Sequence, residues 1–382
     1  MKKLLLIVSI LFPVFTFAQK KPAAPSTYDV LIGTYTSGTS KGVYVYRFYV
    51  ETGKLSYLNE FTTVDDTAFT NPSYLCVSAN NKFVYAVTEN TKGGVAALSF
   101  DASSGKLKML DKQPSKGADP CYISVDKDQK NVFVANYSSG SLAVLPVNKD
   151  GSIGAPSQVI QDVGSSVVKD RQEGPHVHTG ILVPNEKYLL YTDLGTDKIN
   201  IYRYHASKPQ PLTPSTPAFV SVTPGNGPRH IVFSNDGKYA YLIQEIGGVI
   251  TAYDYDNGSL KEIQSVNMLT KAFNGNIGSA AIHISPDGRF LYASNRGNAN
   301  DIVVYAINPD NGQLTFVSRS PSLGKGPRDF AIDPSGKFLL VANQNSDSIV
   351  IYRLDQISGR LIGIVSHIQI GNPVCLKIVP AQ

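Results

Sequence analysis

Four related stretches of the sequence decide the fold. GPRHIVFSNDGKYAYLIQE occupies residues 227–245, and GPRDFAIDPSGKFLLVANQ occupies residues 326–344. SAAIHISPDGRFLYASNRG at residues 279–297 and GPHVHTGILVPNEKYLLYTDL at residues 174–194 follow the same plan. Each has an apolar run, a polar turn closed by a basic residue, and a second apolar run. This repetition indicates a fold built from one unit used several times.

The spacing of the units predicts a β-propeller. We aligned them on the basic residue that closes each turn, namely Lys82, Lys130, Lys187, Lys238, Arg289 and Lys337. Consecutive units then lie 48 to 57 residues apart. A period near fifty, with strand signals and no helical pattern, is typical of propeller blades or β-solenoids. Each unit holds about four short strands, which favours the propeller.

Six units are complete and a seventh is split between the two ends of the chain. YDVLIGTYT, GVYVYRFYV and KLSYLNEF near the N-terminus supply three strands, and NPVCLKIVP at the C-terminus resembles NPSYLCVSA, which opens the next unit. Together they complete one blade, which closes the ring and removes its free edges. We therefore expect an all-β, seven-bladed β-propeller with four-stranded antiparallel blades, as a single domain over residues 28–382.

The first residues of the chain predict export. MKKLLLIVSILFPVFTFA, residues 1–18, has a positive start, an apolar run and small residues before a cleavage point, which is the pattern of a signal peptide. Pro13 and the short apolar run argue against a stable membrane span. Residues 19–27 then form a flexible lead-in. We expect a periplasmic or secreted protein in which the three cysteines are buried thiols.

Composition argues against nucleic acid as a partner. Only 17% of the residues are charged, and Lys2 and Lys3 of the predicted signal peptide contribute two of the five net positive charges. No basic cluster alternates with aromatic residues. The 32 glycines, 23 prolines and 21 tyrosines favour short strands and tight turns instead.

The hairpin geometry predicts where a site would lie. A tight turn between antiparallel strands brings the start of the first strand beside the end of the second. Residues nine before the turn-closing base, and six or seven after it, therefore share one rim around the central channel. The polar residues of this rim that could carry chemistry are His178, Arg229, Glu245, Arg296 and Arg328, with Asn136 and Asn343 as neutral partners.

The charges of the rim indicate an anionic ligand. Arg229 and Glu245 lie on one hairpin and could form an ion pair that only caps the channel. Arginines nevertheless outnumber acids there, which suits a carboxylate or phosphate.

The histidines leave more than one role open. His176 and His178 alternate along a strand, so both would point to one face if the strand is regular. No third ligand stands at a recognisable spacing, so we predict no metal and no cofactor. One of them is expected to be a polar or proton-transfer group, and His283 is a weaker candidate for the site. Motifs for a phosphate loop or a nucleophile elbow are absent from the sequence.

Several motifs resemble a known family. GPHVH at residues 174–178, the stretch at 227–245, IHISPDGRFLYASNRG at 282–297 and GPRDFAIDPSGKFLLVANQNSDSIVIYRL at 326–354 are similar to the seven-bladed propeller lactonases. This family includes the propeller-type 6-phosphogluconolactonases and the fungal 3-carboxy-cis,cis-muconate lactonizing enzymes. The resemblance runs over residues 28–380. It implies a hydrolase of sugar-acid lactones.

The resemblance also implies a set of catalytic residues. The family's His, two Arg and Glu fall on His178 (or His176), Arg229, Glu245 and Arg296. In a lactonase, Arg296 and Arg328 would hold the acidic group of the substrate, and Arg229 would stabilise the oxyanion. Glu245 or His178 would orient or deprotonate the water, and His178 would protonate the leaving oxygen. Guanidinium groups lower the pKa of a carboxylate, which favours His178 as the base.

Two other functions stay open at this point. A cycloisomerase of the carboxymuconate type would need no water, and an exported propeller could bind a glycan or a protein without catalysis. A closed polar funnel would favour an enzyme, whereas Arg229 and Glu245 locked in a pair would favour binding. Export also conflicts with 6-phosphogluconolactone, a cytosolic compound. Either the substrate is another sugar-acid lactone, or the protein is not exported.

Overall fold

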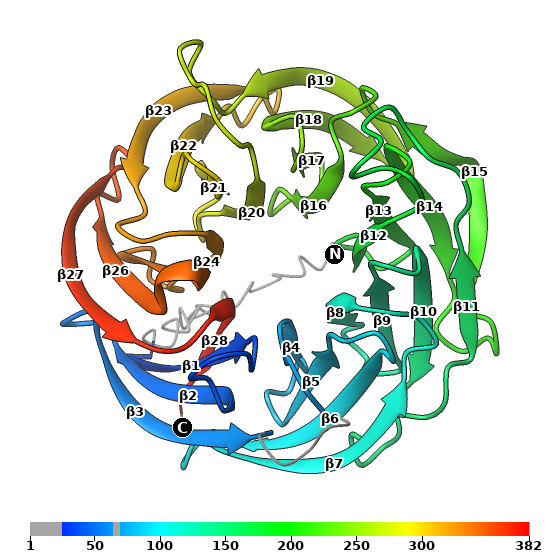
Figure 1. Cartoon of the computed structure of the whole chain (residues 1–382), viewed down its shortest axis with the longest axis horizontal. Coiled ribbons are helices and arrows are strands. Elements are labelled where there is room, and N and C mark those ends of the chain that lie inside the picture. The colour runs from blue at the N-terminus through cyan, green and yellow to red at the C-terminus, as the bar shows by residue number, and fades with distance from the viewer. Residues whose placement is uncertain (1–24, 64–68, 382) are drawn as a thin grey trace, which may run out of the picture.

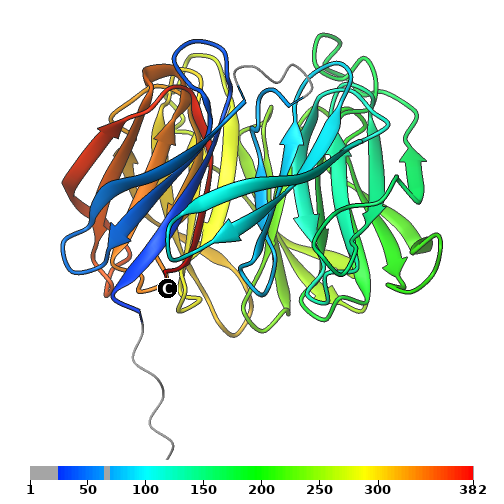
Figure 2. The same ribbon diagram turned by 90° about the horizontal axis from the view of Figure 1, so that it is seen from below.

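The computed structural model describes residues 25–63 and 69–381, and it forms a ring of seven four-stranded antiparallel sheets (Figure 1). This confirms the predicted seven-bladed propeller. The strands run between the two faces of a thick disc (Figure 2). The predicted signal peptide, residues 1–18, and most of the lead-in, residues 19–27, lie outside the described residues. Within the described part of the chain, no helix has the length and apolar character of a membrane span.

Each blade uses four strands in order from the channel outward. The innermost strands are β4 (Leu75–Val77), β8 (Pro120–Val125), β12 (Val177–Leu182), β16 (Pro228–Phe233), β20 (Ser279–Ile284), β24 (Pro327–Ile332) and β28 (Pro373–Pro380). The second strands are β5 (Phe83–Thr88), β9 (Asn131–Asn136), β13 (Tyr188–Asp193), β17 (Tyr239–Gln244), β21 (Phe290–Asn295), β25 (Phe338–Asn343) and β1 (Thr27–Thr34).

The outer strands complete the blades. The third strands are β2 (Gly42–Tyr49), β6 (Gly94–Asp101), β10 (Ser141–Pro146), β14 (Lys198–Tyr204), β18 (Val249–Asp256), β22 (Asp301–Ile307) and β26 (Ser348–Leu354). The outermost strands are β3 (Lys54–Thr62), β7 (Lys106–Pro114), β11 (Gln158–Gln161), β15 (Leu212–Ser221), β19 (Ser259–Asn267), β23 (Leu314–Pro321) and β27 (Leu361–Gln369). A short 3-10 helix, η1 (Gln344–Ser346), follows β25.

The two ends of the chain share one blade, as the sequence predicts. Strand β1 pairs with β2 on one side and with the C-terminal β28 on the other, where Ile32 lies opposite Leu376. Phe48 of this blade packs edge to face on Phe338 of the neighbouring blade, with ring centroids 5.6 Å apart. Burying such a ring contributes about 1.5–3 kcal/mol, so the closure is held by packing as well as by strand pairing.

A β-bulge recurs in the innermost strands. The pairing with the second strand skips one residue in β8, β12, β16 and β24, and the skipped residues are Cys121, His178, Arg229 and Arg328. All four stand nine residues before the turn-closing base. A bulge bends the strand and re-aims a side chain, and bulges are common beside active sites. The bulge therefore changes the direction in which these four side chains point at one end of the channel.

The glycine of the Gly-Pro-Arg motif has a backbone role. Gly227 and Gly326 have φ angles of +64° and +68°, a region that side-chain-bearing residues rarely adopt. At Gly326 a Cβ atom would also lie 2.8 Å from the side chain of Asn345. These glycines let the chain turn into the bulged strand directly before Arg229 and Arg328.

Candidate active site

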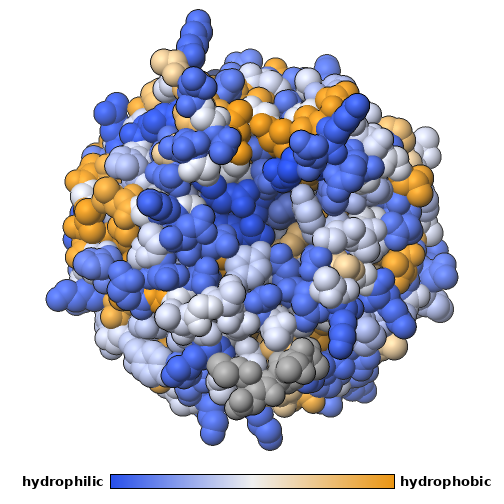
Figure 3. Space-filling view, in the orientation of Figure 1, coloured by the Kyte–Doolittle hydropathy of each residue, from blue (hydrophilic) through white to orange (hydrophobic). Residues whose placement is uncertain are grey.

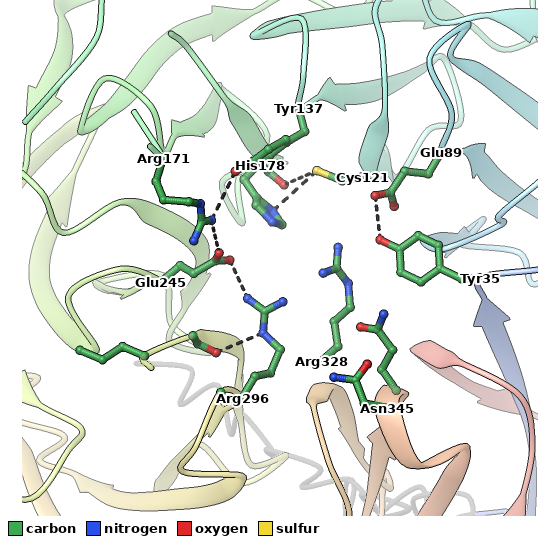
Figure 4. A pocket seen from close by; sticks show the side chains of 14 residues that line it. Tyr35, Glu89, Cys121, Tyr137, Arg171, His178, Glu245, Arg296, Arg328 and Asn345 are labelled. Carbon is green, nitrogen blue, oxygen red and sulfur yellow. Dashed lines mark hydrogen bonds and ion pairs between the residues drawn. The ribbon is translucent and has the colours of Figure 1, made fainter. Parts of the chain in front are cut away.

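A polar pocket of about 520 Å³ lies at one mouth of the central channel. It appears as a hydrophilic hollow in the middle of the face seen in Figure 3. Its wall carries three guanidinium groups, two carboxylates, an imidazole, a thiol and two phenols, which belong to Arg171, Arg296, Arg328, Glu89, Glu245, His178, Cys121, Tyr35 and Tyr137 (Figure 4). A pocket of this size and polarity suits one small charged molecule.

Three arginines surround Glu245. Its Oε1 accepts a hydrogen bond of 2.6 Å from Nη2 of Arg171, and its Oε2 accepts from Nε of Arg229 at 2.9 Å. Nη2 of Arg296 lies 2.8 Å from the same Oε2. We call Arg171, Arg229, Glu245 and Arg296 the arginine cluster. With three cations and one anion, the cluster attracts negative charge.

The charges of the arginine cluster are stable at neutral pH. Burial alone raises the pKa of Glu245, but the surrounding guanidinium groups outweigh burial and hold that pKa well below its usual 4.5. Burial, together with Arg296 and Arg328, lowers the pKa of Arg229 to about 10. Glu245 is therefore ionised, fully engaged and a poor proton acceptor.

Arg229 lies behind Glu245 and is not among the residues that line the pocket. Its side chain is 2% exposed. Besides Glu245, its guanidinium donates to the carbonyl of Ala280 at 2.6 Å and lies 3.3 Å from Nε2 of His230. The ion pair with Glu245, which the sequence left as one possibility, is present, and this position does not favour direct contact between Arg229 and a ligand.

Arg328 is placed differently from the other arginines. It lines the pocket, and its guanidinium lies over the ring of Tyr35 at 5.5 Å from the centroid. Over residues 25–63 and 69–381, its guanidinium makes neither an ion pair nor a hydrogen bond. Burial acts against its charge, but the neighbouring acidic groups of Tyr35 and Glu89 outweigh burial and raise its pKa above the ordinary value for arginine. Its donors are thus charged and available to a ligand.

His176, which directly precedes β12, and His178, which lies in β12, have different surroundings. His178 is 3% exposed, lines the pocket and places Nδ1 3.7 Å from Sγ of Cys121. His176 stacks on Tyr137 with ring centroids 4.5 Å apart, and its Nε2 lies 3.3 Å from Glu173. The strand is not regular here, because the bulge falls between Val177 and Thr179 and breaks the alternation.

His178 is a neutral imidazole at neutral pH. Burial, followed by the charge of Arg229, lowers its pKa well below the ordinary 6.5. A neutral imidazole has one N–H donor and one nitrogen acceptor. Among the described residues, no group of three or more His, Cys, Asp or Glu side chains is arranged to hold a metal ion.

A second carboxylate lines the pocket in a different setting. Oε1 of Glu89 accepts a hydrogen bond of 2.7 Å from the hydroxyl of Tyr35, and Oε2 accepts one from Oγ of Ser73. Burial raises the pKa of Tyr35, so its hydroxyl stays protonated and donates. We call Tyr35, Ser73 and Glu89 the hydroxyl cluster. In the described part of the chain, no ion pair reaches Glu89.

The remaining predicted residues support the site from outside the pocket. The side-chain amides of Asn136 and Asn343 donate to the carbonyls of Ser115 and Ser322, at 3.4 and 3.1 Å. Both are buried and fasten loops at the ends of their blades. They stand six residues after the turn-closing base, whereas Glu89, Tyr137, Glu245, Arg296 and Gln344 stand seven after it and line the pocket. Side chains alternate along a strand, so a shift of one residue changes the direction.

His283 also lies away from the pocket wall. Its Nε2 is 3.2 Å from Oδ1 of Asp329, and its ring meets Phe330 edge to face at 4.8 Å. Of the nine residues predicted for the site, the structure thus brings four to the pocket wall: His178, Glu245, Arg296 and Arg328.

Sequence reasoning did not single out several residues of the pocket wall. Tyr35 follows β1 in the split blade, which has no turn-closing base to align. Arg171 belongs to the connection between β11 and β12, outside the repeat. Glu89 stands at a rim position, but nothing in the sequence distinguishes it from a solvent-facing acid. The only available signal was the repeat position that Glu89 shares with Glu245.

Comparisons with known proteins agree with this fold. The family model described as lactonase, 7-bladed beta-propeller, matches residues 29–378. A protein of Formosa agariphila named 6-phosphogluconolactonase is 39% identical over 87% of this chain and 94% of that protein. The 6-phosphogluconolactonase of Bacillus subtilis is 36% identical over 92% of this chain and 98% of its own length.

Solved structures are similar over nearly the whole chain. A putative 6-phosphogluconolactonase of Bacteroides fragilis is 43% identical with a TM-score of 0.89, covering 94% of this chain and all of that one. The periplasmic gluconolactonase of Pseudomonas aeruginosa is 38% identical with the same TM-score and the same coverage. The chain belongs to the family of seven-bladed β-propeller lactonases.

Proposed function

We propose that this protein hydrolyses a sugar-acid lactone in the pocket at the channel mouth. The observation that carries the proposal is the pocket wall itself, which combines an excess of guanidinium groups with the ionised Glu245, a second glutamate and a neutral imidazole. The 6-phosphogluconolactonases and the gluconolactonase among its relatives support this reaction class.

The guanidinium groups divide between two tasks. Arg296 and Arg171 reach the pocket from the arginine cluster, and they hold the acidic group of a substrate such as a phosphorylated lactone. Arg328 is charged and has no ion-pair partner among the described residues, so it stabilises the oxyanion that forms on the ring carbonyl during attack by water. This differs from the expectation for Arg229, because Arg229 does not line the pocket.

His178 assists the departure of the ring oxygen. As a neutral imidazole, it donates a hydrogen bond to that oxygen while the carbon–oxygen bond breaks. Glu245 keeps its neighbours in place rather than accepting a proton, because both its oxygens are engaged by guanidinium groups.

The two alternative functions, a non-catalytic binding propeller and a cycloisomerase, explain fewer features of the pocket. The locked pair of Arg229 and Glu245 is the feature that we expected of a non-catalytic binding propeller, yet it leaves His178, Arg296 and Arg328 at the surface of a small polar pocket. A cycloisomerase would not need the polar groups that can orient water. We propose export as well, supported by the N-terminal sequence and by the relative described as periplasmic.

The test is the initial rate of ring opening of gluconolactone and 6-phosphogluconolactone, corrected for spontaneous opening. We expect the wild type to exceed the spontaneous rate, and Arg296→Gln to raise the KM for the phosphorylated lactone about tenfold or more. Arg360→Gln is the matched control, because Arg360 is exposed in the connection between β26 and β27 and is not one of the residues that line the pocket. A wild type that accelerates the opening of neither lactone would overturn the proposal.

A further inference from the structure

The pocket contains two carboxylates at equivalent positions of the repeat. Glu89 and Glu245 both stand seven residues after the turn-closing base, Lys82 or Lys238, of their own units. Each contacts the residue nine before that base, which is Ser73 in one unit and Arg229 in the other. The same scaffold position therefore holds one carboxylate against a hydroxyl and the other against a guanidinium.

The groups that surround each carboxylate determine which of the two can accept a proton. Glu245 is neutralised by three arginines, and Oε2 alone contacts two of them. Each oxygen of Glu89 accepts one hydrogen bond from an uncharged hydroxyl. A carboxylate oxygen has about two acceptor sites, so Glu89 keeps acceptor capacity on both oxygens. Glu89 is only partly buried and lines the pocket, so a bound water can reach it.

The hydroxyl cluster lies next to Arg328, where a water that donates to Glu89 could reach a bound carbonyl group. Figure 4 shows Glu89 and Tyr35 on the side of the pocket opposite Glu245 and Arg171, with Arg328 between the two sides. The guanidinium of Arg328 covers the ring of Tyr35, whose hydroxyl donates to Glu89. A carbonyl oxygen held by Arg328 would thus have its carbon close to a water on Glu89.

We propose that Glu89 is the general base of the lactone hydrolysis, an assignment that rests on the function proposed above. Glu89 takes a proton from the water whose oxygen bonds to the ring carbonyl carbon, and the carbonyl oxygen becomes an oxyanion beside Arg328. The carbon–oxygen bond of the ring then breaks, and Glu89 returns the proton to the ring oxygen. The products are a hydroxyl and a carboxylic acid, which releases its own proton to solvent.

Tyr35 and Ser73 act as positioning residues in this scheme. Their hydroxyl groups fix both oxygens of Glu89 and orient the free acceptor sites toward the pocket. Replacement of Tyr35 by Phe removes one of the two donors and leaves the carboxylate in place. We expect a decrease in kcat of a few-fold and a shift of the acid limb of the pH profile, because a hydrogen bond to a charged group favours its ionised form.

The experiment compares Glu89→Gln with wild type, using both lactones over a range of pH. Glutamine has the same shape and still accepts hydrogen bonds, so the fold is expected to persist, which thermal unfolding checks. Glu262→Gln is the matched control, because Glu262 lies exposed on the outermost strand β19. Binding of gluconate, the product, is measured by calorimetry for each protein.

The titratable groups that face Glu89 do not complicate the pH profile. Burial raises the pKa of Tyr35 and of Cys121, and Arg328 stays cationic, so none of these three changes charge between pH 5 and 8. His178 also lines the pocket, but burial lowers its pKa well below 6.5. Protonation of His178 would persist in Glu89→Gln, so an acid limb that remains in this variant would not belong to Glu89.

The expected result is a loss of kcat of about 100-fold or more in Glu89→Gln, the usual contribution of a general base, with the acid limb removed and gluconate binding retained. Glu262→Gln should match the wild type. An active wild type with an equally active Glu89→Gln, or with an unchanged pH profile, would overturn the assignment of Glu89 alone. An inactive wild type would overturn the proposed function and this inference with it.

Discussion

The arginine cluster and the hydroxyl cluster occupy equivalent places in two blades and differ in one decisive neighbour. In the arginine cluster, the bulged residue opposite the glutamate is Arg229, and two further arginines converge on Glu245. In the hydroxyl cluster, the equivalent residue is Ser73, and within the described chain the carboxylate of Glu89 accepts hydrogen bonds from the hydroxyl groups of Ser73 and Tyr35. The repeat thus places a glutamate at the same position of two blades in two charge environments. Glu245 is suited to hold its neighbours in place, and Glu89 is suited to accept a proton.

The largest expected effect comes from the same substitution made in both clusters. Glu245→Gln leaves the buried Arg229 without its counter-charge, and breaking a buried ion pair in this way costs about 3–5 kcal/mol of unfolding free energy. Glu89→Gln breaks no ion pair within residues 25–63 and 69–381, so its loss of unfolding free energy should be clearly smaller than that of Glu245→Gln. Urea unfolding measures both. Equal losses in the two variants would contradict the contrast between the clusters.

Arg328 lies between the two clusters, so replacing it tests whether both clusters act on one substrate. Arg328→Gln removes a guanidinium that has no ion-pair partner in the described part of the chain, so we expect kcat to fall about 100-fold, as for other oxyanion donors, while the unfolding free energy changes little. Steady-state kinetics with either lactone provides the measurement. If Arg328→Gln lowered stability as strongly as Glu245→Gln, Arg328 would have a structural partner that this account does not include.

Two buried histidines, His178 and His230, should also make the protein sensitive to acid. Burial first, and the charge of Arg229 next, hold the pKa values of His178 and His230 well below 6.5. The unfolded chain then binds more protons than the native one below pH 6.5, so stability falls as pH decreases, by up to about 1.4 kcal/mol per pH unit for each histidine. Glu245, whose pKa is lowered, adds a further loss below about pH 4.5.

Urea unfolding at pH 7 and pH 5 measures this slope. We expect a clear loss for the wild type, and a smaller loss for His230→Phe, which removes one of the two imidazoles with a lowered pKa. A wild type with equal stability at both pH values would show that the histidines are not held neutral.

The fold could be predicted from sequence because its determinants are local and repeated. The turn around Lys238 and the flanking apolar runs define one blade, and the N- and C-terminal strands complete the ring by similarity to the next unit. The pocket was predicted in part for the same reason, since hairpin register fixes which residues reach the rim.

The rest of the site depends on features that no local pattern records. Because of the bulge in β12, His178 faces the pocket and His176 does not. Because side chains alternate along β9, Asn136 points into the blade and donates to the carbonyl of Ser115. Arg171 comes from a connection outside the repeat. The depth of Arg229 behind Glu245 follows from the convergence of several blades, which only the three-dimensional structure reveals.

The most direct test of the central claim is a crystal structure of Glu89→Gln with a sugar-acid lactone bound. The account predicts one lactone in the pocket, with its carbonyl oxygen on Arg328 and its carbonyl carbon facing the side chain at position 89, at direct hydrogen-bond reach or through one water. A lactone bound outside this pocket, or one whose carbonyl carbon faces Glu245 and turns away from position 89, would contradict it.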